Sequence, residues 1–312
     1  MSEATLVFGA DGGGTKTLGI LADRSGTELA RMQVGPGNPN VAGVDTAARN
    51  LLELIGGCCE LAKRSPQEIG AAVFGLAGVG SLVVRASLEE ALRVLAAPRG
   101  WSSMPMILET DARIALEGAF GGGPGIVLIA GTGSNVIGKL PSGEVASVGG
   151  WGRVLGDEGS GYAIGLEAAR AVAREIDGRG DAPRLRALLA DRFGWTSRDR
   201  VIAAVYQEKF DLASVAPVVL GAAAEGDASA VRILESAAHQ LAETLRALAA
   251  RMEGGTPVGV VFTGGLIDHD TPYAGILQRA ISTEVPGAEV VPALYAPAKG
   301  AVILAHQRLQ RR

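Results

Sequence analysis

The sequence has few of the features that mark secreted, membrane-bound or metal-binding proteins. It contains only two cysteines, and because Cys58 and Cys59 are adjacent they cannot form a framework disulfide. This favours a reducing compartment, with both thiols as small buried side chains. No apolar run reaches the length of a membrane span, and the first residues lack the basic and apolar regions of a secretory signal. We therefore expect a soluble, cytoplasmic protein without a membrane partner.

Concentrated positive charge and metal-ligand spacing are also lacking. The net charge is −4, and the 29 Lys and Arg residues are scattered, whereas nucleic-acid binding needs a basic face. A nucleic-acid partner is thus disfavoured. His239, His269 and His306 lie far apart, and no His-Glu-x-x-His or Cys-x-x-Cys pattern occurs. The chain also has no Gly-x-Ser-x-Gly element, which argues against an α/β-hydrolase.

Glycine, in contrast, is abundant, with 45 of the 312 residues. The glycines form clusters between apolar runs, which is typical of loops that approach a ligand closely. The chain length predicts about two domains.

Hydrophobic periodicity predicts that one structural theme occurs twice. Each half begins with three strand-like runs and continues with strands that alternate with helices. In the first half the expected elements are strands 5–10, 15–21 and 28–34, with a hairpin turn at 23–26 between the last two, a loop at 35–40, helix 44–64, strand 71–76, helix 83–96, strand 105–108 and helix 111–119. In the second half they are strands 126–130, 134–139 and 144–148, a broken helical region 160–252, strand 258–262, helix 272–283, strand 289–291 and helix 297–308.

This order predicts an α/β protein with two mixed sheets and crossover helices. The glycine run 121–125 interrupts the pattern, and we expect one domain at 1–118 and a second at 119–296. The C-terminal helix 297–312 is a candidate to complete the first domain. Two such domains would have a cleft between them, a usual place for ligands.

Three glycine-rich turns follow strands and carry hydroxyl side chains. They lie at 11–15, 131–135 and 263–265. Such turns present backbone N–H groups without a Cβ in the way, which suits phosphate oxygens, although each turn alone could be a plain hairpin. Walker A spacing fails, because Thr15 precedes Lys16 and a strand follows. The dinucleotide fingerprint fails too, since the turn at 131–133 opens a strand rather than a helix.

Three candidate carboxylates lie where a strand ends or a helix begins. Asp11 either forms the first turn or helps to hold Mg²⁺ beside a phosphate. Asp111 follows a strand and begins a helix, so it is an N-cap, a general base toward a substrate hydroxyl, or both. The segment 157–161, Asp-Glu-Gly-Ser-Gly, also looks like a capped helix start.

Together these segments resemble the N-acetylglucosamine kinase group of the BadF/BadG/BcrA/BcrD ATPase family, within the actin/Hsp70/sugar kinase superfamily. The stretch 149–160, GGWGRVLGDEGS, is the most specific match, and it is similar to the stretch that lines the sugar pocket in these kinases. The other matching segments are DGGGTKT at 11–17, ETDA at 109–112, IAGTGSN at 129–135, FTGGL at 262–266 and the closing segment 292–305. The resemblance implies two ribonuclease H-like domains of the actin/hexokinase type.

The resemblance also implies roles for residues. Asp111 would be the catalytic base, and Asp11 would be the metal ligand. The residues expected to bind ATP are Gly12, Gly13, Gly14, Thr15, Lys16, Thr132, Gly133, Gly264 and Gly265. Those expected to bind the sugar are Asn38, Asn135, Gly150, Trp151 and Asp157.

The activity that the resemblance implies is ATP- and Mg²⁺-dependent phosphorylation of an amino sugar, N-acetylglucosamine or glucosamine, at O6. Kinases for N-acetylmuramic acid or glucose remain alternatives, and a homodimer is a candidate assembly. A second class of function is an ATPase that activates a partner enzyme through an iron–sulfur cluster, for which Cys58 and Cys59 are poorly placed. A third is a non-catalytic sugar sensor.

Overall fold

The computed structural model describes residues 6–252, 257–268 and 270–310. Thr5, His269 and the last two residues of the chain, which were included in the sequence-based expectations, lie outside these ranges. The chain forms two compact units: Met1–Pro124 together with Pro292–Arg312, and Gly125–Val291. The first unit thus runs on to Pro124, past the expected boundary at residue 118.

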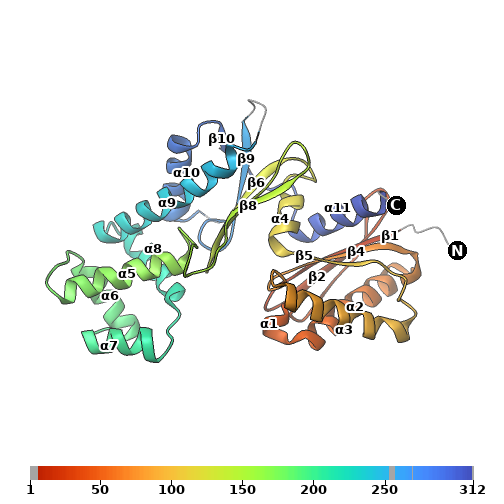
Figure 1. Ribbon diagram of the computed structural model, residues 1–312, viewed down its shortest axis with the longest axis horizontal. Coiled ribbons are helices and arrows are strands. Elements are labelled where there is room, and N and C mark those ends of the chain that lie inside the picture. The colour runs from red at the N-terminus through yellow and green to blue at the C-terminus, as the bar shows by residue number, and fades with distance from the viewer. Residues whose placement is uncertain (1–5, 253–256, 269, 311–312) are drawn as a thin grey trace. The chain divides into compact units, whose positions relative to one another are not determined.

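The sheet of the first unit has five strands in the order β3-β2-β1-β4-β5. Figure 1 labels β1, β2, β4 and β5 of this sheet. The strands are β1 (Leu6–Gly12), β2 (Thr17–Asp23), β3 (Glu28–Val34), β4 (Ile69–Leu76) and β5 (Met106–Thr110). β2 and β3 pair antiparallel, while β4 and β5 run parallel to β1. The carboxyl ends of β1, β4 and β5 therefore meet at one edge of the sheet, where open α/β sheets usually bind ligands.

Helices cover both faces of this sheet. α2 (Val44–Ala62) and α3 (Leu82–Ala96) enclose one core, and α4 (Asp111–Ala119) and α11 (Pro297–Gln310) enclose the other. α11 can approach α4 closely because Gly300 has no side chain: a Cβ there would lie 1.9 Å from the Ile114 carbonyl oxygen. The remaining short elements are α1 (Pro39–Ala42), η1 (Pro66–Glu68) and η2 (Ala97–Arg99).

The second unit repeats the same sheet topology, in the order β10-β9-β6-β7-β8. Its strands are β6 (Gly125–Ala130), β7 (Ser134–Lys139), β8 (Val145–Gly149), β9 (Val258–Thr263) and β10 (Ala288–Val290). β6, β7 and β8 are antiparallel neighbours, and β9 and β10 run parallel to β6. The predicted α/β class with two mixed sheets is therefore confirmed.

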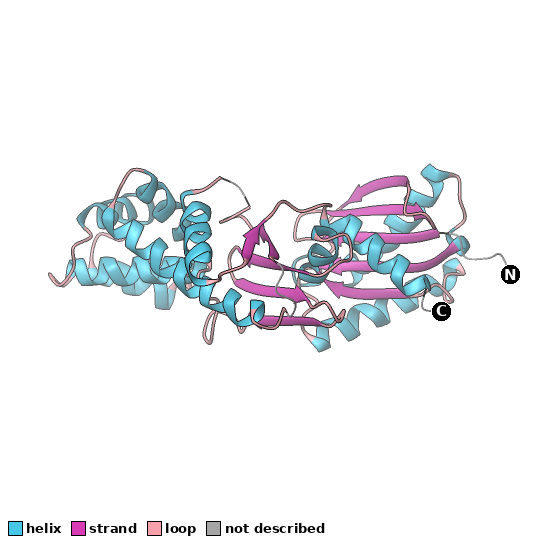
Figure 2. Cartoon of the chain, turned by 90° about the horizontal axis from the view of Figure 1, so that it is seen from above, coloured by secondary structure: helices cyan, strands magenta, loops and turns pink. Residues whose placement is uncertain are grey.

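The second unit contains more helix than the first (Figure 2). Its helices are α5 (Gly161–Ile176), α6 (Pro183–Phe193), α7 (Arg198–Ile202), the π-helical turn η3 (Ala203–Gln207), η4 (Leu212–Val215), α8 (Ala216–Ala224), α9 (Ala228–Ala249) and α10 (Pro272–Glu284). Trp195 and Tyr273 are fully buried among them.

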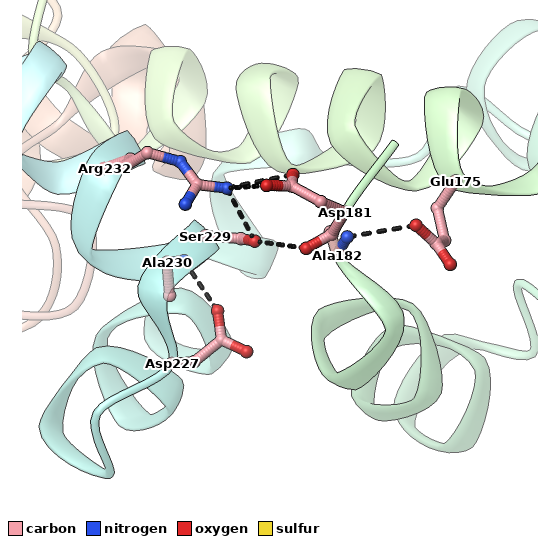
Figure 3. A network of polar contacts seen from close by, with 7 residues as sticks. All are labelled: Glu175, Asp181, Ala182, Asp227, Ser229, Ala230 and Arg232. Carbon is pink, nitrogen blue, oxygen red and sulfur yellow. Dashed lines mark hydrogen bonds and ion pairs between the residues drawn. The ribbon is translucent and has the colours of Figure 1, made fainter. Parts of the chain in front are cut away.

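A polar network ties the loop before α6 to the start of α9 (Figure 3). The Arg232 guanidinium donates to both Asp181 carboxylate oxygens at 2.9 Å, and the buried Ser229 hydroxyl donates to the Asp181 carbonyl at 3.0 Å. Asp227 caps α9 by accepting from the Ala230 amide at 2.7 Å. Because the Arg232–Asp181 pair is exposed, it contributes little to stability, and the network serves as a local connection between helices.

The local predictions are mostly confirmed. The turn at 23–26 connects β2 to β3, and the Asp23 carboxylate accepts from the amides of Ser25 and Thr27. Cys58 and Cys59 are buried, and burial raises the pKa of each thiol to about 11. Among the described residues, no helix is both long and apolar enough to cross a bilayer.

The loop expected at 35–40 needs correction, because its end is the start of α1 (Pro39–Ala42). Pro39 occupies the first helical turn, where its missing N–H costs nothing, and the Asn38 side chain caps the helix.

Candidate functional site

In the first unit, the candidate residues begin at the turn between β1 and β2. The Gly13 amide donates to the Lys16 carbonyl at 2.9 Å and closes the turn, while Gly14, Thr15 and Lys16 are exposed. Gly12 lies against Gly37, and a Cβ on Gly12 would lie 3.3 Å from the Gly37 Cα. The exposed part of the turn is therefore free to receive an anionic ligand.

Two carboxylates accompany this turn. Asp11 precedes it in β1, in register with Gly75 of β4, which pairs with Glu109 of β5. Burial, and then the nearby Asp111 carboxylate, raise the pKa of Asp11 to about 6, with Lys16 acting in the opposite direction. The structure thus brings Asp11 and Asp111 together, as two like charges that a cation would stabilise.

Asp111 is not the cap of its helix. The side chain of Thr110 accepts from the Arg113 amide at 3.2 Å and caps α4, and Asp111 is the exposed first residue of the helix. One Asp111 oxygen accepts from the Ala112 amide at 2.9 Å. The N-cap interpretation of Asp111 is therefore wrong, and its carboxylate is available for chemistry.

The loop that carries Asn38 is attached directly to the glycine turn. The Gly13 carbonyl accepts from the amides of Gly37 and Asn38, both at 3.1 Å. The buried Thr17 hydroxyl donates to the Gly35 carbonyl at 2.8 Å. Sequence reasoning gave no role to Thr17, although it belongs to the motif at 11–17. Its fully buried hydroxyl holds the loop that carries Asn38 against the glycine turn between β1 and β2.

In the second unit, the candidate residues begin at the equivalent turn, between β6 and β7. The Gly131 amide donates to the Gly133 carbonyl at 2.9 Å and closes the turn. The carbonyls of Gly131 and Thr132 accept from the amides of Gly161 and Tyr162, at 2.8 and 3.1 Å. The first turn of α5 therefore holds this loop, and the exposed Thr132 side chain remains available.

Asp157 is another candidate residue of the second unit. Its backbone is left-handed, with φ 60°, an uncommon state for a residue other than glycine. Its carboxylate accepts from the Ser134 amide at 3.3 Å, and a Cβ on Gly133 would lie 3.1 Å from both carboxylate oxygens. The cap of α5 is Ser160, which accepts from the Ala163 amide, so Asp157 does not have the capping role.

Asn135 and Gly150, two more of the expected sugar residues, lie near each other, and a third, Trp151, is exposed. Among the described residues, the buried Oδ1 of Asn135 has no hydrogen-bond partner, which is unusual and suits a missing ligand. Gly150, with φ 69°, allows this side chain its space, because a Cβ there would lie 3.0 Å from the Asn135 Oδ1. Trp151, the next residue in the chain, is in contrast 74% exposed.

The third glycine turn follows β9. Gly264 has φ 103°, and a Cβ there would lie 2.5 Å from the Ala130 carbonyl oxygen at the end of β6. The Leu266 amide donates to that same carbonyl at 3.2 Å. Gly264 therefore lies beside the end of β6, whereas a Cβ on Gly265 would meet nothing within 4 Å.

A magnesium ion is compatible with the acidic groups of the first unit. Within the described ranges no group of three or more His, Cys, Asp and Glu could hold a metal alone. Mg²⁺ commonly uses only one or two carboxylates, with water and substrate phosphates as its other ligands. Asp11 is the expected metal ligand, and the nearby Asp111 carboxylate adds negative charge beside it.

Comparison with known proteins identifies the family and its relatives. A model of the BadF/BadG/BcrA/BcrD ATPase family matches residues 8–305. The chain is 31% identical over 303 residues to an N-acetylmuramic acid/N-acetylglucosamine kinase of Clostridium acetobutylicum, covering 96% of this chain and 97% of that protein. It is 29% identical over 318 residues to an N-acetyl-D-glucosamine kinase of Dictyostelium discoideum, with the same coverage of 96% and 97%. A crystal structure described as a putative N-acetylglucosamine kinase from Chromobacterium violaceum aligns with a TM-score of 0.70 and 27% identity, over 97% of this chain and 99% of that one.

Proposed function

The chain belongs to the BadF/BadG/BcrA/BcrD ATPase family, and from this membership we propose that it is an ATP-dependent kinase of an amino sugar. The observation that carries the proposal is the proximity of the Asp11 and Asp111 carboxylates at the Gly12–Lys16 turn, a glycine-rich turn of the kind that suits phosphate oxygens. The two curated relatives described above act on N-acetylglucosamine, and one of them also on N-acetylmuramic acid. We take N-acetylglucosamine as the first candidate substrate.

Asp111 is the proposed general base. In the reaction a sugar hydroxyl, for which we propose O6, forms a bond to the γ-phosphorus of ATP while the bond from that phosphorus to the β–γ bridging oxygen breaks. The hydroxyl proton passes to the Asp111 carboxylate, and ADP leaves. The exposed position of Asp111 and its separation from the capping role support this assignment.

The glycine turns are the proposed sites for ATP. In the first unit we assign Gly12, Gly13, Gly14, Thr15 and Lys16 to phosphate binding. In the second unit we assign Thr132 and Gly133 to phosphate and Gly264 and Gly265 to the nucleoside. Backbone amides and hydroxyls suit phosphate oxygens, and the lack of a Cβ lets the backbone approach closely.

The amide and carboxylate side chains are the proposed contacts to the sugar. Asn38 in the first unit, and Asn135 and Asp157 in the second, are candidates to supply acceptors and donors. Gly150 and Trp151 lie in the same loop as Asp157. The partnerless Oδ1 of Asn135 supports this role, since a site that pairs a substrate hydroxyl discriminates against analogues that lack it.

Asp11 would hold Mg²⁺, while Asp111 stays available as the base. Bound with ATP, the ion would neutralise charge on the phosphates. The two cysteines argue against the alternative of an iron–sulfur activator. Cys58 and Cys59 are buried with raised thiol pKa values, so they are unsuited to hold a cluster as thiolates.

A sugar panel tests the proposal. The purified chain is incubated with Mg²⁺ and ATP, and ADP release is followed in a coupled assay with N-acetylglucosamine, glucosamine, N-acetylmuramic acid or glucose. We expect release that depends on an amino sugar, and NMR of the product then identifies the phosphorylated oxygen. Equal ADP release with and without every sugar would contradict the kinase function.

A further inference from the structure

Two residues outside the expected site, Asn40 and Gly78, hold Asn38 in place. Asn38 caps α1: its Oδ1 accepts from the Asn40 amide at 2.9 Å. The Asn40 side chain in turn donates through Nδ2 to the Gly78 carbonyl at 3.3 Å. The short helix is thereby attached to the turn that follows β4, although the two segments are 38 residues apart in the chain.

Gly78 is required by this contact. Its φ is 86°, in the left-handed region that favours glycine. A Cβ there would lie 2.5 Å from the Asn38 Oδ1 and 2.6 Å from the Asn40 Nδ2. Any side chain at position 78 would therefore push away both amides at once. Gly80, in the same turn, has nothing within 4 Å of a Cβ and no such backbone constraint.

The cap also determines which chemical group of Asn38 remains free. The orientation of an amide is usually ambiguous, but a backbone N–H can only donate, so the atom that faces the Asn40 amide must be the oxygen. In the part of the chain that the structure describes, no protein acceptor pairs with the Asn38 Nδ2. Asn38 is half-buried, so this NH₂ group is the part of the side chain that can meet a ligand.

We propose that Asn40 and Gly78 are positioning residues for Asn38. They hold its side chain so that Nδ2 donates a hydrogen bond to the sugar, and the substrate presents an uncharged oxygen acceptor to this group. A hydroxyl or an N-acyl carbonyl satisfies this requirement, whereas a protonated amine in that place does not. This inference rests on the proposed kinase function and on the assignment of Asn38 to the sugar.

Variants at position 38 separate recognition from folding. Asp is about as good an N-cap as Asn, so Asn38→Asp keeps the helix cap and replaces the NH₂ donor with a negatively charged oxygen that can only accept. We expect the KM for N-acetylglucosamine to rise about tenfold or more, with the KM for ATP within about twofold of the original and an unchanged melting temperature. Asn38→Ala loses the cap as well, so it should also melt earlier.

Variants at 40 and 78 test the positioning role. Asn40→Ala and Gly78→Ala should raise the sugar KM about three- to tenfold and leave the ATP KM unaltered, since the glycine turn that we assign to ATP is untouched. Gly80→Ala is the matched control and should behave as the original chain. Because Asn40→Ala and Gly78→Ala act on the same contact, the double variant should show a smaller increase than the product of the two single effects.

The outcomes distinguish this inference from the function on which it rests. If the unmodified chain phosphorylates no sugar, the kinase proposal fails and the sugar-reading role fails with it. If the unmodified chain is active but Asn38→Asp keeps its sugar KM, Asn38 is not a donor to the substrate. If Gly78→Ala matches Gly80→Ala in sugar KM, the positioning role is wrong even though the kinase stands.

Discussion

The Asp157 carboxylate accepts a hydrogen bond from the Ser134 amide at 3.3 Å, which joins the loop before α5 to the glycine turn after β6. This single contact connects a residue that we assign to the sugar with a turn that we assign to phosphate. Ser134 strengthens the connection, since its hydroxyl donates to the Glu158 carbonyl at 2.7 Å. A substrate that moves Asp157 therefore also affects the turn.

Replacing Asp157 by Asn should separate charge from backbone shape. Asn tolerates the left-handed conformation as well as Asp does, so we expect the melting temperature to stay within about 2 °C. Loss of the carboxylate should reduce kcat/KM for the sugar by about tenfold or more. Steady-state kinetics and a thermal melt on the same preparation measure both effects. Unchanged kcat/KM would remove Asp157 from the sugar site.

Replacing Asp111 by Asn should abolish most of the turnover. Loss of a general base typically costs about 10²- to 10⁴-fold in rate, while ATP binding should persist because the glycine turns are unchanged. Rapid-quench kinetics and nucleotide titration test the two parts. Asp45→Asn is the matched control, because Asp45 likewise lies in the first turn of a helix, α2. Near-normal phosphorylation by Asp111→Asn would remove the base role from this residue.

The raised pKa of Asp11 predicts a dependence of stability on pH. Because the pKa is about 6 in the folded protein against 3.8 for the free side chain, the folded chain keeps a proton that the unfolded chain releases. The contribution of Asp11 to the free energy of unfolding is therefore complete below pH 3.8 and is lost as pH rises through about 6.

Urea unfolding of the original chain and of Asp11→Asn, without nucleotide or metal, measures this contribution. The difference in unfolding free energy between the two proteins should fall by about 1 kcal/mol from about pH 5 to about pH 8. A difference that stays level across this range, or rises, is incompatible with a raised Asp11 pKa.

Two adjacent glycines after β9 should respond differently to the same substitution. Gly264→Ala introduces a Cβ 2.5 Å from the Ala130 carbonyl oxygen on a backbone with φ 103°, so it should destabilise the fold by about 1–3 kcal/mol and weaken ATP binding. Gly265→Ala meets nothing within 4 Å and should stay within about 0.5 kcal/mol in stability. Chemical denaturation and nucleotide titration measure both. Equal costs for the two variants would show that the close contact at Gly264 is not what the fold depends on.

The two cysteines should be unreactive in the folded protein. Burial raises the pKa of both thiols to about 11, and the thiolate is the reactive form. A thiol reagent such as DTNB should therefore label neither cysteine on mixing at neutral pH, and should label both after unfolding. Rapid labelling of the native chain would indicate that α2 opens readily.

Most of the fold could be predicted because the responsible signals are local. Alternating apolar residues indicate strands, the turn at 23–26 indicates a hairpin, and the glycine run 121–125 indicates an interruption of the pattern. Each signal is contained within a few neighbouring residues. Helix caps were predicted less well, because a local pattern does not distinguish between neighbouring residues that can both cap a helix. Thr110 and Asp111 are neighbours with similar N-cap preference, and only the backbone path at the end of β5 selects Thr110.

The sequence alone determined the α/β repetition, the three glycine turns and the acidic residues at the ends of strands, because each depends on spacing along the chain. Only the tertiary structure decided which distant groups meet. It placed Asp111 near enough to Asp11 to raise its pKa, attached Asp157 to Ser134, and set Gly78 against Asn38. These contacts depend on how strands and helices pack, and no local pattern specifies the partner of a side chain that lies tens of residues away.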